Sequence, residues 1–181
     1  MDTIVFDIET KNSFADVGGE ENLKKLDVSV VGVYSYKDDA YSCFGENELE
    51  KIKEIFRQSS LLIGFAIKRF DLPVLEKYFL SKDDFNLHSI PCFDILEEIE
   101  RSLGRRVGLG ELAKANLGVG KTAASLEAID FYRNGEMEKL KDYCLSDVKL
   151  TKDLYELLKS HGYLWIPQRF SAKMLKWEYR I

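Results

Sequence analysis

The stretch from Ile4 to Thr10, Ile-Val-Phe-Asp-Ile-Glu-Thr, constrains the fold more than any other part of this 181-residue chain. An apolar run that leads into two acids spaced two residues apart predicts a buried strand. Successive side chains of a strand point to opposite faces, so Asp7 and Glu9 share one face and Ile8 lies on the other. Two like charges held this close repel each other unless a cation or a proton intervenes. Either this strand end binds a hard divalent cation, or it carries two solvated acids.

The remaining pattern predicts strands in the first half of the chain and helices in the second. Strands are expected at 3–6, 28–36, 40–44, 61–65 and 90–93, the second and third as a hairpin. Helices are expected at 46–58, 71–79, 95–103, 109–117, 125–134 and 136–160, and the polar segment 11–21 is expected to be a loop. This order favours an α/β fold with a mixed sheet flanked by helices, in one domain over residues 1–181.

Composition excludes some classes of protein and leaves others open. A net charge of −5 does not indicate a nucleic-acid binder, but local patches can still attract one. Three widely separated cysteines argue against a disulfide framework and against a cysteine-rich zinc site. The sequence shows no membrane-length apolar run and no signal peptide, so we expect a cytoplasmic protein without a membrane partner.

Four further acidic and aromatic residues are candidates for function. Asp71 follows a short strand and would open a helix, where a capping role competes with a metal-binding role. Tyr143 and Asp147 lie four residues apart on a helix, so they share its apolar, inward face. An acid on such a face is paired or binds metal, and a boundary aspartate bonded to a lysine is the alternative. Tyr143 alone would be a core aromatic, and Asp94 is interpreted as a helix cap.

Two familiar catalytic patterns are excluded. The segment 118–122, Gly-Val-Gly-Lys-Thr, resembles the end of a phosphate-binding P-loop, but that pattern requires glycine where this chain has Ala115. It also follows a helical run rather than a strand, so a turn between helices is favoured. The two histidines, His88 and His161, lie outside any acid-bearing motif, which argues against Ser/His/Asp and Cys/His mechanisms.

Three short motifs, taken in order, resemble the DEDD superfamily of 3′–5′ exonucleases in its tyrosine subclass. They are Asp7-x-Glu9, Phe70-Asp71 after a glycine-led strand, and Tyr143-x-x-x-Asp147. The segment 143–151 is especially similar to the third motif of proofreading domains in family B DNA polymerases. The region 92–114 also resembles stand-alone prokaryotic members, so the resemblance extends over most of the chain.

This resemblance implies an RNase H-like fold, with a mixed central sheet of about five strands flanked by helices. It implies a metal-dependent 3′–5′ exonuclease that acts on single-stranded nucleic acid, with DNA favoured and a role in DNA repair. By analogy, Asp7 bridges two Mg²⁺ or Mn²⁺ ions, Glu9 and Asp147 complete the shell of one ion, and Asp71 supports the other. Tyr143 would orient the attacking water.

The substrate contacts are less well marked. Ala66 stands where the second motif of the family usually carries asparagine, an amide that would serve the substrate or the local turn. This departure concerns substrate affinity rather than metal binding. A frayed 3′ end is held by stacking aromatic residues and by polar or basic residues along its backbone. The candidates are Thr10 and Phe14 beside the first motif, and Lys68 and Arg69 beside the second.

Several alternatives stay open at this point. The tail, residues 168–181, interleaves basic and aromatic residues. It could contact nucleic acid or pack its aromatics onto the domain. The alternative to an enzyme is an exonuclease-like module that holds a nucleic-acid end or a partner protein without cutting. The sequence does not distinguish DNA from RNA ends, and it does not identify a helicase or polymerase partner.

Overall fold

The computed structural model describes residues 1–80, 85–120, 125–168 and 173–179. Its centre is a five-stranded mixed sheet in the order β3-β2-β1-β4-β5. The strands are β1 (Asp2–Thr10), β2 (Val28–Ser35), β3 (Ala40–Gly45), β4 (Ser59–Gly64) and β5 (Cys92–Asp94). The central strand β1 pairs antiparallel with β2 and parallel with β4. The expected α/β sheet and its hairpin of second and third strands are confirmed.

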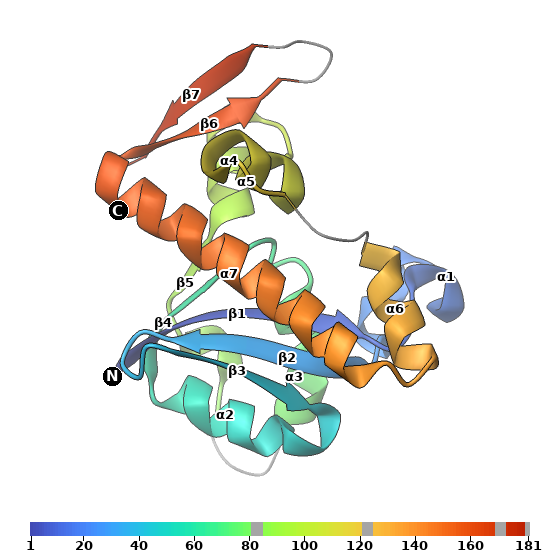
Figure 1. The fold of residues 1–181 in the computed structure, drawn as a ribbon. Helices are drawn as coiled ribbons and strands as arrows, with labels where there is room; N and C mark the ends of the chain where they lie inside the picture. Colours follow the sequence, from blue (N-terminus) through green and yellow to red (C-terminus); the bar gives the residue numbers. More distant parts are fainter. Residues whose placement is uncertain (81–84, 121–124, 169–172, 180–181) are drawn as a thin grey trace.

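Helices cover both faces of this sheet (Figure 1). The α-helices are α1 (Phe14–Val17), α2 (Leu49–Arg57), α3 (Asp71–Phe79), α4 (Ile95–Leu103), α5 (Leu109–Leu117), α6 (Ser125–Arg133) and α7 (Met137–His161), and the short 3₁₀ helices are η1 (Glu20–Lys25), η2 (Glu46–Glu48) and η3 (Leu87–Ser89). The long helix α7 crosses one face, while α2 and α3 lie against the other. Among the helices of the described residues, none combines the length and the apolarity needed to cross a membrane.

The alternation of side chains along β1 assigns its residues to two different cores. Ile4, Phe6 and Ile8 pack with residues of α2 and α3. Val5 packs on the opposite face with residues of α4, α5 and α7. The predicted alternation is therefore confirmed, and it leaves Asp7 on the face that α7 covers.

A glycine in β2 allows α7 to approach the sheet closely. A Cβ atom added to Gly32 would lie 2.9 Å from the Sγ atom of Cys144 and 3.0 Å from a methyl carbon of Val148. Any larger residue would push this part of α7 outward. Because Asp147 is adjacent to Val148, Gly32 helps to bring this acid down to β1.

The expected loop over 11–21 contains helical structure instead. Ser13 is the N-cap of α1, and Ser13 and Asp16 bond each other's backbone N–H groups in a capping box. The Ser-x-x-Asp pattern is the signal that could have identified this turn, although a four-residue helix leaves little periodicity to detect. This helix presents Phe14 toward the end of β1.

The C-terminal part of the chain forms a hairpin that the sequence interpretation did not include. Strands β6 (Tyr163–Pro167) and β7 (Met174–Glu178) pair antiparallel and extend beyond the central sheet (Figure 1). Trp177 is buried in the core that also holds α5 and α7, so packing is the role of this part of the tail. Arg169, Phe170 and Arg180 of the tail lie outside the described residues, as do Lys121 and Thr122 of the P-loop-like segment.

Candidate metal centre

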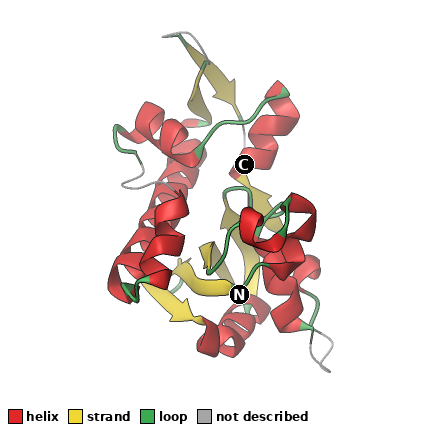
Figure 2. Cartoon of the chain, turned by 90° about the vertical axis from the view of Figure 1, so that its right-hand side faces the viewer, coloured by secondary structure: helices red, strands yellow, loops and turns green. Residues whose placement is uncertain are grey.

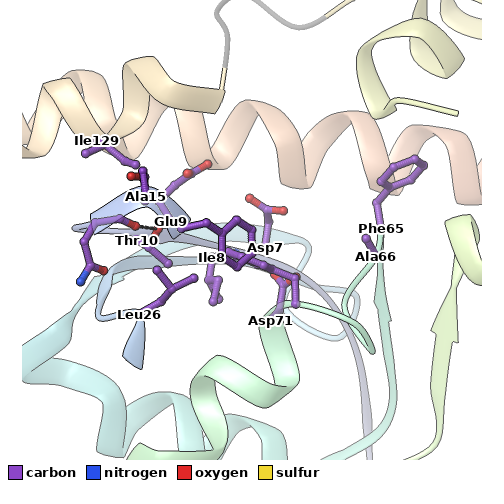
Figure 3. A pocket seen from close by; sticks show the side chains of 14 residues that line it. Asp7, Ile8, Glu9, Thr10, Ala15, Leu26, Phe65, Ala66, Asp71 and Ile129 are labelled. Carbon is purple, nitrogen blue, oxygen red and sulfur yellow. Dashed lines mark hydrogen bonds between the residues drawn. The ribbon is translucent and has the colours of Figure 1, made fainter. Parts of the chain in front are cut away.

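Three carboxylates meet where β1 lies beneath α7. Asp7 and Glu9 extend from the α7 side of β1, opposite to Ile8 (Figure 3), and Asp147 comes from α7 itself. One carboxylate oxygen of each residue lies within 4.8 Å of the other two. Ligand oxygens that surround one divalent cation at 2.0–2.6 Å lie up to about 4–5 Å apart, so this group can share an ion.

The fourth predicted ligand, Asp71, comes from α3 and lies outside this group of three. It is the first residue of α3, and its Oδ1 atom accepts the backbone N–H of Ile8 at 3.0 Å. It is 3% exposed and lines the same cavity as Asp7 and Glu9 (Figure 3). The N-cap position of α3 is Phe70, which makes no side-chain capping bond, so the alternative role of Asp71 as the cap does not apply.

Tyr143 lies one turn before Asp147 on α7, as its spacing predicts. It is 4% exposed and packs in a small core with Val30, Ala128 and Leu140. The buried ring fits the role of a core aromatic, and this packing also fixes the hydroxyl on the helix face that carries Asp147. Its proposed role toward water stays a prediction.

The buried thiol of Cys144 lies beside the acids, and their charges contribute to the shift of its pKa. The Sγ atom of Cys144 lies 3.5 Å from the backbone oxygen of Asp7, to which it donates a hydrogen bond. The pKa of this thiol is raised well above its ordinary value, first by its hydrogen bond with Cys43, then by burial and by the charges of Asp7 and Glu9. The thiol therefore stays protonated at neutral pH.

A cavity of about 500 Å³ opens beside the acids. Its apolar wall comes from Ile8, Phe14, Leu26, Phe65, Phe70 and Ile129. The rings of Phe14 and Phe70 meet edge to face, with centroids 5.9 Å apart. A site with carboxylates at one side and aromatic rings at the other can take a ligand that is charged at one end and flat and apolar at the other.

Two of the predicted substrate residues line this cavity and two do not. Thr10 and Phe14 lie in its wall, and the Thr10 hydroxyl donates to the backbone oxygen of Asn12 at 2.9 Å. Lys68 and Arg69 lie on a separate hollow beside α4.

Both basic side chains are engaged in ion pairs there. The ammonium of Lys68 lies 2.6 Å from a carboxylate oxygen of Glu97, and Arg69 lies 2.9 Å from Glu100. The hydrogen bond with Glu97 is also the largest cause of the raised pKa of Lys68. A contact of Lys68 or Arg69 with substrate would require these pairs to exchange partners, and it stays a prediction.

The sequence interpretation missed most of the apolar wall. Phe70 had a local signal, since it directly precedes Asp71. Leu26 and Ile129 come from segments far apart in sequence, between β1 and β2 and within α6, and reach the cavity only through the tertiary fold. Hydrophobic periodicity indicates that such residues are buried, but not which cavity they line.

Comparison with known proteins agrees with this architecture. A solved structure of the family B DNA polymerase from the hyperthermophilic archaeon Pyrobaculum calidifontis is similar in fold, with a TM-score of 0.65 and 16% sequence identity. The match covers 87% of this chain and 24% of the polymerase chain, so this chain spans about a quarter of the polymerase's length. No curated protein matches the sequence. The family model of the RNase H superfamily matches residues 4–159, which include all four acids and Tyr143, and the chain belongs to this superfamily.

Proposed function

We propose that this chain is a metal-dependent 3′–5′ exonuclease of the tyrosine subclass of the DEDD superfamily. It hydrolyses phosphodiester bonds at the 3′ end of single-stranded nucleic acid, with DNA favoured and with trimming of ends in DNA repair as its context. The observation that carries the proposal is the meeting of Asp7, Glu9 and Asp147 beside an apolar cavity. Membership in the RNase H superfamily supports nuclease activity in general.

The donor set fits Mg²⁺ or Mn²⁺. It consists of carboxylate oxygens, which these hard cations prefer, whereas zinc sites use mainly histidine and cysteine. Asp7, Glu9 and Asp147 would hold one ion, and Asp7 with Asp71 would hold a second. Two bound ions of this kind supply an activated water and stabilise the leaving oxygen of a phosphodiester.

The chain's own residues would set the position of the substrate. Phe14 and Phe70 offer ring surfaces on which the terminal base can stack, with its phosphate at the acids. The cavity of about 500 Å³ has room for one unpaired terminal nucleotide, which supports the proposed preference for single-stranded or frayed ends. Tyr143 would orient the attacking water through its hydroxyl, one helical turn from Asp147.

The direction of cleavage is the test. A single DNA strand labelled at its 5′ end should shorten by one nucleotide at a time with Mn²⁺ or Mg²⁺, and it should stay intact in EDTA. The same strand closed by an inverted 3′-terminal nucleotide should resist, and an RNA strand of the same sequence should be degraded more slowly.

The controls separate this proposal from its rivals. An Asp7→Asn chain from the same preparation should leave the strand intact, which excludes a contaminating nuclease. Cleavage of a circular single strand, or shortening from the 5′ end, would contradict exonuclease action of this polarity. Binding of the strand without cleavage by the unmutated chain would instead support the non-cleaving module.

A further inference from the structure

One buried acid close to the candidate centre takes no part in the proposed chemistry. Asp94 ends β5, is 1% exposed and is the N-cap of α4. Its Oδ1 atom accepts the N–H of Glu97 at 3.2 Å, which confirms the expected helix cap. The same carboxylate also accepts the N–H of Ala66 at 2.8 Å and the N–H of Lys68 at 3.0 Å. Two of its three bonds therefore go to the loop between β4 and α3.

This loop has a conformation that its own residues disfavour. Ala66 has a φ of 67°, in the left-handed region that residues with a Cβ rarely adopt. The turn is also tight, because a Cβ atom on Gly64 would lie only 2.0 Å from a methyl carbon of Ile67. The two hydrogen bonds to Asp94 therefore stabilise the strained backbone around Ala66.

The loop in turn sets the start of α3. The backbone oxygen of Ala66 accepts the N–H of Phe70 at 3.1 Å, and that of Ile67 accepts the N–H of Leu72 at 2.9 Å. The N-cap residue of α3 makes no side-chain capping bond. The first turn of α3, which carries Asp71, is thus positioned by the same loop that Asp94 holds.

We propose that Asp94 is a positioning residue for the metal centre. By holding Ala66 and Lys68, its carboxylate fixes the loop and thereby sets Asp71 against β1, where Asp71 can hold its divalent cation. The inference rests on the proposed function, because it assigns Asp71 to one of the two ions. It differs from a capping role, which needs only the bond to Glu97.

The variant Asp94→Ser separates the two roles. Serine is a good N-cap, so the bond to Glu97 can persist, but one short hydroxyl cannot also hold Ala66 and Lys68. In a calorimetric titration with Mn²⁺ we expect the first ion to bind as in the unmutated chain and the second to bind about tenfold or more weakly. Amide hydrogen exchange should become faster at residues 66–72 and stay unchanged in α7.

Two further variants show whether the effect is specific. Asn116→Ala removes a distant polar contact, in which Asn116 bonds both the backbone N–H and the backbone oxygen of Trp165, at 2.7 and 2.8 Å. This control should lower the melting temperature and leave both Mn²⁺ affinities unchanged. Adding Ala66→Gly to the Asp94→Ser chain should restore part of the second affinity, because glycine adopts this backbone conformation without strain.

The outcomes distinguish failure of this inference from failure of the proposed function. If the unmutated chain and Asp94→Ser bind two Mn²⁺ ions equally well, the positioning role is overturned and the nuclease proposal stands. Equal loss of the second ion in Asn116→Ala would also overturn it, because the effect would then reflect general stability. If the unmutated chain binds no Mn²⁺, the proposed function fails and the assigned role of Asp71 fails with it.

Discussion

The acids at the end of β1 and the acid at the end of β5 belong to one sheet, but their carboxylates have opposite surroundings. Asp94, at the end of β5, accepts three backbone N–H groups. At β1, oxygens of Asp7, Glu9 and Asp147 lie within 4.8 Å of one another. The first arrangement stabilises a buried charge through the fold, whereas the second holds like charges together.

From this difference we predict which acids serve structure and which serve function. An acid that the backbone satisfies should cost stability when it is removed. Removal of an acid that faces other acids should lower activity. It should leave the stability of the metal-free fold unchanged or raise it. The following predictions test this contrast, from the largest expected effect to the smallest.

Replacing Asp7 should have the largest effect. Asp7→Ala removes a ligand of both proposed ions, so exonuclease activity should fall by at least about 10³-fold. In EDTA the variant should melt at or above the temperature of the unmutated chain, because one repelling charge is gone. Added Mn²⁺ should raise the melting temperature of the unmutated chain alone. Equal stabilisation of both chains by Mn²⁺ would place the ion elsewhere.

Replacing Tyr143 tests the proposed mechanism without removing a proposed metal ligand. Tyr143→Phe keeps the buried ring and deletes the hydroxyl, so the fold and Mn²⁺ binding should be unchanged. Loss of one positioned hydrogen bond in the transition state should slow cleavage about 10²–10³-fold, or about 2.7–4 kcal/mol. Single-turnover degradation of a 5′-labelled strand measures this rate. Full activity would reduce Tyr143 to a core aromatic.

Replacing Asp94 should destabilise the metal-free chain, which is the opposite of the response expected for Asp7→Ala. Asp94→Ala removes a helix cap, worth about 1 kcal/mol, and leaves the N–H groups of Ala66 and Lys68 without their acceptor. We expect the free energy of unfolding in EDTA to fall by about 2–3 kcal/mol, as measured by urea denaturation. A loss no larger than that caused by Asp7→Ala would remove the contrast between the two sites.

Replacing Ala66 by glycine should have the smallest effect on stability. Unlike the same change inside a helix, it should stabilise the chain. Ala66→Gly relieves the left-handed strain and should stabilise the chain by up to about 1 kcal/mol. The matched control is Ala115→Gly inside α5, where glycine should destabilise by about 1 kcal/mol. Asparagine at position 66 should behave like glycine, because asparagine also tolerates the left-handed region. Destabilisation by both changes at position 66 would contradict the strain.

Local periodicity was sufficient to predict the sheet and the elements that carry the acids. Alternation along β1 placed Asp7 and Glu9 on one face, and the helical stripe placed Asp147 on the inward face of α7. The helix expected at 71–79 is α3, and Pro73 lies in its first turn, where a residue needs no N–H partner.

Features that depend on tertiary contact were missed. The bonds of Asp94 to Ala66 and Lys68 join segments separated in sequence by 28 and 26 residues, and no local pattern reports them. The ion pairs of Lys68 and Arg69 with α4 likewise depend on how α3 and α4 come together. The β6–β7 hairpin was missed although Leu164, Ile166 and Trp177 alternate with exposed residues, since each strand is only five residues long.

The central claim is that acids of β1 and α7 hold metal ions together. Figure 1 shows α7 crossing the sheet near β1, and Figure 2 shows helices on both sides of the sheet. The most direct test of the central claim is therefore a crystal structure of the chain with Mn²⁺ and a short single DNA strand, with Mn²⁺ located by its anomalous scattering. The account predicts one peak among Asp7, Glu9 and Asp147 and a second between Asp7 and Asp71, with the 3′-terminal base at Phe14. A bound strand with no Mn²⁺ at Asp7 would contradict it.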